Sequence, residues 1–162
     1  MALVDQPSVV NIYTLLQEPA SINDDMQRHL GFYHPGTRTW VFDKLNSWSR
    51  NEKQNNAFWV NGTGGLGKSV IAAEYLRRAR DDKSHFTAAV GFFCRHNDAT
   101  RNDPQSAVLN LAYQLAQQLE PVKSALLQGR ENIRKVVSDA STDLVELFDL
   151  LMQLAIGKDR QW

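Results

Sequence analysis

The sequence has a single cysteine and no excess of charge of either sign, and each shortage excludes a class of protein. Cys94 has no second cysteine to pair with, so an internal disulfide is impossible, and no Cys/His spacing of a zinc site is present. Eighteen basic residues balance eighteen acidic ones, so no net field concentrates nucleic acid or an anionic membrane. Any binding of phosphate groups must therefore depend on a local site.

Long apolar runs are also missing. No window approaches twenty consecutive apolar residues, and the N-terminus lacks the basic and then apolar stretches of a secretory signal. Hydrophobic residues make up 43% of the 162 residues and charged residues 22%, a balance typical of a globular domain. We therefore expect a cytoplasmic chain with neither nucleic acid nor a membrane as its partner.

What is present is a glycine-rich stretch in an informative context. Residues 57–60 read Ala-Phe-Trp-Val, the pattern of a short buried strand, and residues 70–76 carry apolar side chains at helical spacing. Between them lies a complete G-x-x-x-x-G-K-S pattern, the signature of a phosphate-binding P-loop. Its members are Gly62, Thr63, Gly64, Gly65, Leu66, Gly67, Lys68 and Ser69.

Each residue type in this pattern suits a triphosphate. Glycines let the backbone turn its N–H groups toward phosphate oxygens, and the following helix adds free N–H groups and the positive end of its dipole. Lys68 can reach the β- and γ-phosphates, and the Ser69 hydroxyl is placed to ligate Mg²⁺. We predict binding of ATP, or of GTP, with Mg²⁺. The simpler alternative is a glycine-rich turn with a solvated Lys68, against which the strand-and-helix context argues.

The order of the apolar segments predicts the fold class. A second run at residues 87–94 is rich in β-branched and aromatic residues, so strand, loop, helix and strand follow one another. This order is typical of parallel α/β proteins. We expect a P-loop NTPase with a three-layer α/β/α arrangement around a parallel sheet, which is incomplete here and has a helix-rich C-terminal portion.

The C-terminal portion carries helix signals in sequence. Asp103 is a plausible N-cap for a helix that begins at Pro104. Pro121 and Gly129 bracket a second helix. Further helices are expected over residues 130–138 and after Thr142, which can cap the last helix before Gly157 stops it.

The sequence predicts two segments, with a boundary after residue 36. Residues 1–36 are interpreted as a helical or linker segment, and residues 37–162 as the partial NTPase domain. Thr39 is the expected cap of a helix in which apolar residues recur up to Trp48. The tryptophans at positions 40, 48 and 59 are interpreted as core or packing residues, and the arginines at positions 77, 78 and 80 as a solvated helix end.

Residues for hydrolysis are harder to find than residues for binding. Hydrolysis needs a carboxylate on another strand to hold Mg²⁺. The run 87–94 ends in Arg95 and His96, and Asp149 lies inside a helical pattern. The missing carboxylate is therefore expected beyond Trp162 or not at all, so turnover by this chain is left undecided, although the parent protein is expected to be an NTPase.

Several segments together resemble the NACHT-type members of the STAND signalling NTPases. They are residues 35–40 (Pro-Gly-Thr-Arg-Thr-Trp), residues 57–69, and residues 92–95 (Phe-Phe-Cys-Arg) followed by Asp103 and Pro104. The resemblance covers about residues 33–156. It implies a nucleotide-controlled switch that recruits protein partners or self-associates in the full-length protein.

The same resemblance implies roles for particular residues. Gly62, Gly67, Lys68 and Ser69 would bind phosphate and magnesium, with Val70 next to them. The segment 36–38 would lie near the base and ribose, which adds Arg38 to the expected cofactor-binding set. Arg95 would lie near the γ-phosphate, or else be an ordinary arginine at a strand end.

Other functions remain open at this point. A P-loop kinase for a small molecule would need a second pocket with an acidic base, and the sequence offers no clear one. A binding module could retain the P-loop after losing hydrolysis. Cys94 and His96 could form a nucleophile–base pair, but no third group orients the histidine, so we interpret them as a core cysteine and a loop histidine.

Overall fold

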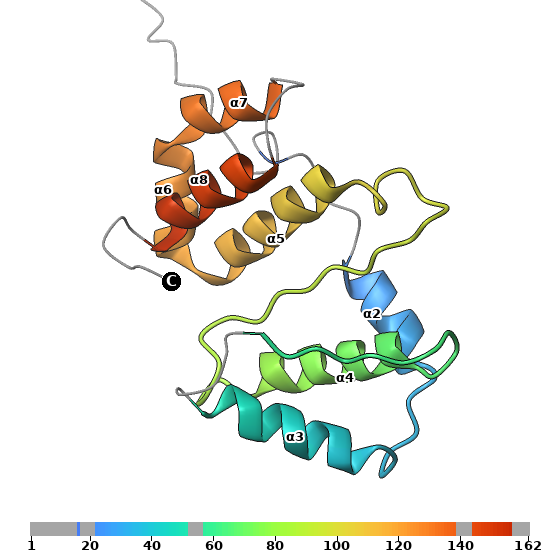
Figure 1. The fold of residues 1–162 in the computed structure, drawn as a ribbon. Helices are drawn as coiled ribbons and strands as arrows, with labels where there is room; N and C mark the ends of the chain where they lie inside the picture. Colours follow the sequence, from blue (N-terminus) through green and yellow to red (C-terminus); the bar gives the residue numbers. More distant parts are fainter. Residues whose placement is uncertain (1–15, 17–21, 52–56, 139–143, 157–162) are drawn as a thin grey trace, which may run out of the picture. The chain divides into compact units, whose positions relative to one another are not determined.

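The computed structural model describes residues 16, 22–51, 57–138 and 144–156, and within them the chain forms helices joined by irregular segments (Figure 1). The helices are α2 (Ile22–Leu30), α3 (Thr39–Ser49), α4 (Lys68–Asp81), α5 (Pro104–Gln118), α6 (Glu120–Gln128), α7 (Arg130–Ser138) and α8 (Leu144–Ile156). None of the helices in these ranges is long and apolar enough to cross a membrane.

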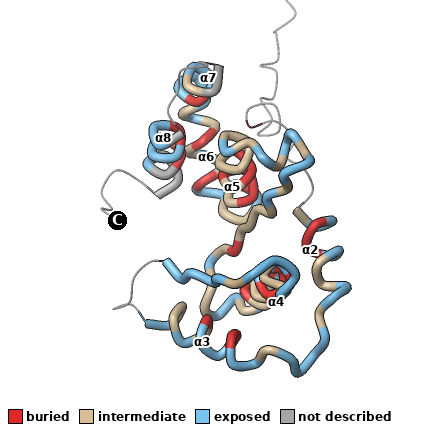
Figure 2. Tube along the Cα trace, turned by 45° about the vertical axis from the view of Figure 1, so that its right-hand side comes forward, coloured by how far each residue is buried: buried red, intermediate tan, exposed pale blue. Residues whose placement is uncertain are grey.

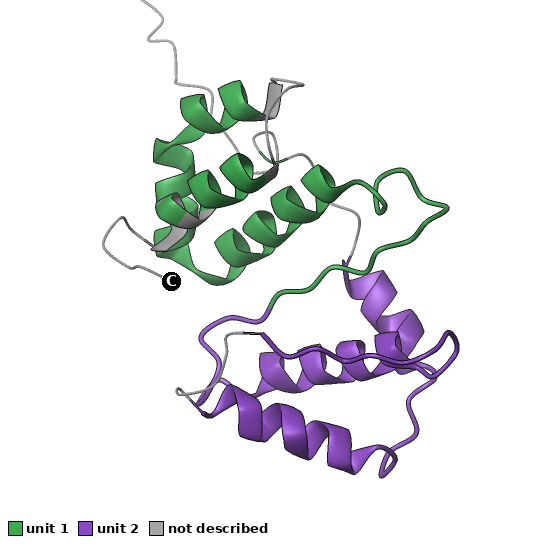
Figure 3. Cartoon of the chain, in the orientation of Figure 1, with its two compact units in different colours: residues 1–20, 90–162 green, residues 21–89 purple. Residues whose placement is uncertain are grey.

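The chain divides into two compact units (Figure 3). One consists of residues 21–89 and contains α2, α3 and α4. The other consists of residues 1–20 and 90–162 and contains α5 to α8. The glycine-rich loop and Arg38 belong to the first unit. The domain boundary predicted after residue 36 stays a prediction.

The predicted parallel sheet, and with it the three-layer α/β/α architecture, is wrong. In the part of the chain that the structure describes, no residue is in a strand or a bridge, and the runs 57–60 and 87–94 have irregular backbone. A strand depends on hydrogen bonds to neighbouring strands, and short isolated strands are marginal in water. The apolar and β-branched residues of these runs express a local preference, but they lack the partners that would build a sheet.

Two of the tryptophans are exposed and do not lie in a core. Trp59 is 87% exposed, and it belongs to the run 57–60, whose residues are all exposed (Figure 2). Trp40 is 64% exposed and lies outside the face of α3 that is buried by Val41, Phe42 and Leu45. The interpretation of these two tryptophans as core residues is therefore wrong, and the alternative that they pack against another domain stays a prediction.

In the unit of α5 to α8, a side chain makes the hydrogen bonds to backbone groups that a neighbouring strand makes in a sheet. The Gln114 side chain of α5 accepts a hydrogen bond from the Gly91 N–H (3.2 Å) and donates one to the Gly91 carbonyl (2.7 Å). It also donates to Asn110 Oδ1 at 2.6 Å. Because buried backbone groups must find partners, this amide holds the segment before α5 where a neighbouring strand would otherwise do so.

The C-terminal helices confirm most of the capping signals. Asp103 is the N-cap of α5, and its carboxylate accepts hydrogen bonds from the N–H groups of Gln105 and Ser106. Gly129 is the C-cap of α6, and Pro121 lies in the first turn of that helix. Thr142 and Gly157, predicted to bound the last helix, lie outside the described residues.

These helices enclose one apolar core. Its buried members are Leu16, Leu109, Ala112, Tyr113, Ala116, Val122, Leu126, Ile133, Leu147 and Leu151. Leu126 of α6 and Ile133 of α7 are fully enclosed, at 0% exposure. Truncation of either side chain to alanine should lower the free energy of unfolding by about 2–5 kcal/mol, so these residues hold the two helices in the core.

The unit of α2 to α4 has a smaller core, and this core supports the glycine-rich loop. Val41, Phe42 and Leu45 of α3 pack with Ile71 of α4, and Tyr33 and Tyr75 cover the cluster. The Tyr75 hydroxyl donates to the Leu45 carbonyl at 3.3 Å. The predicted cap of α3 needs correction, since the N-cap is Arg38 and Thr39 is the first helical residue.

Candidate functional site

The glycine-rich loop runs directly into α4, as the sequence pattern predicts. Gly65 (φ 82°) and Gly67 (φ 79°) adopt left-handed backbone conformations that side chains disfavour. Gly67 is the N-cap of α4. These two glycines therefore set the path by which the chain turns from the loop into the helix.

The first turn of α4 presents free hydrogen-bond donors. The first intrahelical bond runs from the Ile71 N–H to the Gly67 carbonyl (3.0 Å), and no side chain caps the helix. The N–H groups of Lys68, Ser69 and Val70 consequently have no intrahelical acceptor and point out of the helix toward the loop. Together with the positive end of the helix dipole, they favour an anion. The Ser69 side chain is exposed at the same end.

The Lys68 side chain folds back over the loop instead of extending into solvent. Its ammonium donates to the Gly62 carbonyl at 2.7 Å and to the Thr63 carbonyl at 2.9 Å. In the described part of the chain, Lys68 forms no ion pair with a carboxylate. The loop backbone therefore holds this positive charge at its mouth, where an anion could approach it.

Arg38 reaches the same place from the start of α3. A Cβ atom built on Gly67 would lie 2.8 Å from Arg38 Nη2 and 3.1 Å from both Cζ and Nη1, so the guanidinium rests against the Gly67 backbone. The structure thus brings Arg38, the one expected ligand outside the 62–70 segment, into contact with the loop. Together with the folded Lys68, it makes the mouth of the loop strongly cationic.

Two contacts within the loop were not anticipated from the sequence. Asn61 Oδ1 accepts a hydrogen bond from the Gly62 N–H at 2.7 Å. The Leu66 side chain folds over Gly62, where an added Cβ would lie 3.0 Å from Leu66 Cδ1. An asparagine before a glycine is a familiar turn signal, so the Asn61 contact could have been found from the sequence.

A buried carboxylate anchors the helix that carries the loop. Glu74 is 2% exposed and accepts two hydrogen bonds from Arg77 (both 2.9 Å) and one from Arg78 (2.8 Å). Arg78 also donates to the Tyr33 hydroxyl at 3.0 Å, and its guanidinium lies 4.1 Å from the centre of the Phe42 ring. These contacts tie α4 to α3 and to the residues just before it.

This network corrects the interpretation of the three arginines as a merely solvated helix end. Arg77 and Arg78 pair with Glu74, and Arg80 donates to the Ala89 carbonyl and to Asn23 Oδ1. The hydrogen bond from Arg77 is the main reason that the pKa of Glu74 is lowered, so the carboxylate stays ionised although it is buried. The spacing of a glutamate with arginines three and four residues later was the available signal.

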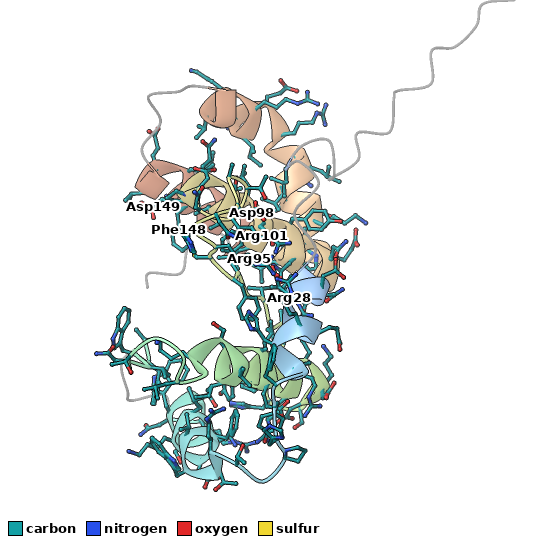
Figure 4. The ribbon with its side chains drawn as sticks, turned by 90° about the vertical axis from the view of Figure 1, so that its right-hand side faces the viewer. Arg28, Arg95, Asp98, Arg101, Phe148 and Asp149 are labelled. Atoms are coloured by element: carbon teal, nitrogen blue, oxygen red, sulfur yellow. The ribbon has the colours of Figure 1, made fainter. Side chains whose placement is uncertain are left out.

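Arg95, which the resemblance would place near the γ-phosphate, belongs to the other unit. Figure 4 shows it beside Asp98 and Arg101 on the loop that precedes α5. The loop is closed by hydrogen bonds from the Arg95 N–H to the Arg101 carbonyl (3.0 Å) and from the Arg101 N–H to the Asp98 carbonyl (2.9 Å). Its role at a phosphate stays a prediction.

Cys94 and His96 were interpreted as a core cysteine and a loop histidine, and the structure agrees only for the histidine, which lies in a turn. The Cys94 thiol is free and exposed, so its interpretation as a core residue is wrong. His96 is exposed as well. Among the described residues, no three acidic, histidine or cysteine side chains gather in a way that could hold a metal ion.

Comparison with known proteins gives one family. The model of the family described as nephrocystin 3, N-terminal, matches residues 36–161, a span that includes Arg38, the glycine-rich loop and all the helices from α3 to α8. No curated protein and no solved structure matches the chain.

Proposed function

The chain belongs to the nephrocystin 3 N-terminal family, and on this premise we propose that it binds a nucleoside triphosphate, ATP or GTP, through residues 62–70. The phosphate chain would lie on the loop and on the first turn of α4. The proposal concerns a local loop-and-helix site and needs no sheet.

The position of the Lys68 ammonium is the observation that carries the proposal. It is held at 2.7 Å and 2.9 Å from two loop carbonyls, next to the helix end that presents the N–H groups of Lys68, Ser69 and Val70. Carbonyl oxygens are weaker acceptors for an ammonium than phosphate oxygens, which carry a formal charge. A phosphate group can therefore replace them at small cost and gain the backbone donors as well.

The residues present also fit a magnesium ion that arrives with the nucleotide. Mg²⁺ prefers oxygen ligands and is commonly bound by one or two protein groups, substrate phosphates and water. Ser69 offers an exposed hydroxyl on the first turn of α4. This hydroxyl would hold the ion, and the ion would neutralise charge on the β- and γ-phosphates.

In the full-length protein, we place this site in a cytoplasmic signalling switch of the NACHT/STAND type. Nucleotide state would there control the recruitment of protein partners or self-association. Support comes from the resemblance of residues 35–40 and 57–69 and from the net charge of zero, which argues against nucleic acid or a membrane as the partner. The proposal is for binding, and it assigns no residue to hydrolysis or to phosphate transfer.

Calorimetric titration of the chain with Mg·ATP and with Mg·GTP tests the proposal. We expect saturable binding of at least one nucleotide, and a loss of affinity of about 10- to 100-fold in Lys68→Ala, because a charge-assisted contact to phosphate disappears. Lys83→Ala is the matched control, since Lys83 is an exposed lysine in the same unit, after α4. It should bind as the parent chain does.

Circular dichroism of each variant establishes that it is folded before its affinity is compared. Equal affinity in the parent chain and in Lys68→Ala would move the binding site away from the loop. A folded parent chain that binds neither nucleotide would contradict the proposal itself.

A further inference from the structure

We propose that Arg38 is a second phosphate-binding cation of this site and that it selects for the β- and γ-phosphates of the nucleotide. This inference rests on the proposed function. It differs from what the family resemblance implies for residues 36–38, namely a position near the base and ribose.

The first argument is position. The atoms Nη1, Nη2 and Cζ of Arg38 all lie 2.8–3.1 Å from the point where a Gly67 Cβ would be, so the end of the guanidinium lies against Gly67. Gly67 is the N-cap of α4, directly before the free N–H groups of the first turn. Arg38 therefore stands beside the backbone donors that would hold phosphate.

The second argument is charge. A cation next to a helix N-terminus is disfavoured by the helix dipole, and the Lys68 ammonium adds a further positive charge to the same loop. Within the described residues, the Arg38 side chain forms no ion pair or hydrogen bond that would offset the repulsion between these positive charges. Two cations that converge on a positive helix end without a carboxylate are balanced by a ligand with more than one negative charge.

The third argument is the backbone of Arg38. With φ 56° and ψ 27°, it is left-handed, and it is the only non-glycine residue with a positive φ among those the structure describes. A left-handed conformation is unfavourable for arginine and usually persists where the surrounding structure enforces it, often at functional sites. Here it directs the side chain back from the start of α3 toward the loop.

The chemistry of the guanidinium defines the ligand. Its planar fork can bind two phosphate oxygens at once, which an ammonium cannot do. With Lys68 held at the Gly62 and Thr63 carbonyls and Arg38 held at Gly67, a chain of two or three phosphates on the loop can contact both cations. A single phosphate can engage the backbone N–H groups and one cation, so Arg38 contributes less to its binding.

Arg38→Gly is the sharpest test, because glycine adopts the left-handed conformation freely and so removes the guanidinium without straining the start of α3. Affinities are measured by calorimetry for Mg·ATP, AMP and inorganic tripolyphosphate. We expect a loss of about 10- to 100-fold for Mg·ATP and tripolyphosphate, and a loss of about 3-fold or less for AMP. Arg38→Lys should recover only part of the affinity, because it restores charge without the fork.

Arg50→Ala serves as the control, since it removes an arginine from the C-terminal cap of the same helix. It should leave all three affinities unchanged. Equal losses for ATP and AMP in Arg38→Gly, with tripolyphosphate unaffected, would place Arg38 at the base or ribose and overturn the inference. Unchanged affinity for ATP would overturn it as well.

The outcome also separates this inference from the proposed function. If the parent chain binds ATP and tripolyphosphate and only the effect of Arg38→Gly is missing, the proposed function stands and the role of Arg38 falls. If the folded parent chain binds none of the three ligands, both fall together.

Discussion

Gly67 is the position where the glycine that the P-loop pattern requires is also required by the backbone conformation. Its φ of 79° is unfavourable for any side chain, and a Cβ there would lie 2.8 Å from Arg38 Nη2. Gly64, three residues earlier, has no positive φ and open space around its Cα. Of these two glycines of one motif, only Gly67 is required by the backbone conformation of the loop, as Gly65 with its φ of 82° also is.

Gly67→Ala should therefore destabilise the chain, whereas Gly64→Ala should not. A left-handed alanine costs about 1–2 kcal/mol relative to glycine, and displacing the Arg38 guanidinium adds to this. Urea unfolding followed by circular dichroism measures the difference. Equal unfolding midpoints for the two variants would mean that the Gly67 conformation or the Arg38 contact is not as described.

At the scale of elements, α4 carries the site and is held by a network around a buried carboxylate. Glu74 is in the second turn of α4 and pairs with Arg77 and Arg78, and Arg78 also donates a hydrogen bond to the Tyr33 hydroxyl. Because Glu74 itself is buried, removal of its arginine partners would leave an uncompensated buried charge. The loop therefore leads into a helix whose position is fixed by several charge-assisted hydrogen bonds.

Glu74→Ala should lower the free energy of unfolding by about 1–3 kcal/mol, since Arg77 and Arg78, whose side chains are 44% and 38% exposed, lose their charge-assisted hydrogen bonds. Glu131→Ala is a suitable control, because the Glu131 side chain is 74% exposed in its pair with Arg134. That substitution should change stability by no more than about 0.5 kcal/mol. Thermal or urea unfolding gives both values, and a neutral effect of Glu74→Ala would contradict the anchoring role.

The elements also show what a sequence can and cannot predict. The helices α4 and α5 were predictable because their signals are local: Gly67 and Lys68 start one, and Asp103 and Pro104 start the other. The runs 57–60 and 87–94 predicted strands, but a strand requires partners that are distant in sequence, and composition cannot supply them. Trp59 was assigned to a core for the same reason.

The candidate site shows a similar division. The loop residues 62–69 are contiguous, so spacing alone identified them. The contact of Arg38 with Gly67 joins residues far apart in the sequence, and periodicity gave no sign of it. The resemblance had included Arg38 among the ligands, but the guanidinium's position against Gly67 became visible only in the structure.

For the whole molecule, the carboxylates determine how stability depends on pH. The pKa of Glu74 is lowered chiefly by its hydrogen bond from Arg77, and that of Asp103 chiefly by its hydrogen bond with Ser106. Hydrogen bonds from Ser84 and Thr100 similarly lower the pKa of Asp82 and of Asp98. Both units contain such groups, so both are stabilised by ionised carboxylates.

The sign of the effect follows from linkage. A carboxyl whose pKa is lower in the folded state stabilises the fold above its unfolded pKa, and this contribution is lost as pH falls through the folded value. We therefore expect stability to decline below about pH 4.5, the ordinary pKa of glutamate. The pKa of His29 is lowered in the folded state, mainly by burial, so the unfolded chain takes up this proton first. Protonation of His29 therefore also reduces stability, starting as pH falls below 6.5.

Urea unfolding between pH 7 and pH 3 measures this dependence. Glu74→Ala should show a flatter decline than the parent chain, because the group with the most charge-assisted contacts no longer titrates. A parent chain that gains stability on acidification, or a variant with the same slope, would contradict the assignment.

The central claim, that residues 62–70 bind the phosphates of a nucleotide, is tested most directly by nuclear magnetic resonance of the backbone amides during titration with Mg·ATP. We predict that the largest chemical-shift changes fall on the N–H groups of residues 62–70 and on Arg38, and that in Lys68→Ala the same changes need a nucleotide concentration about 10- to 100-fold higher. Changes confined to the helices α5 to α8, or no changes at saturating nucleotide, would contradict the account.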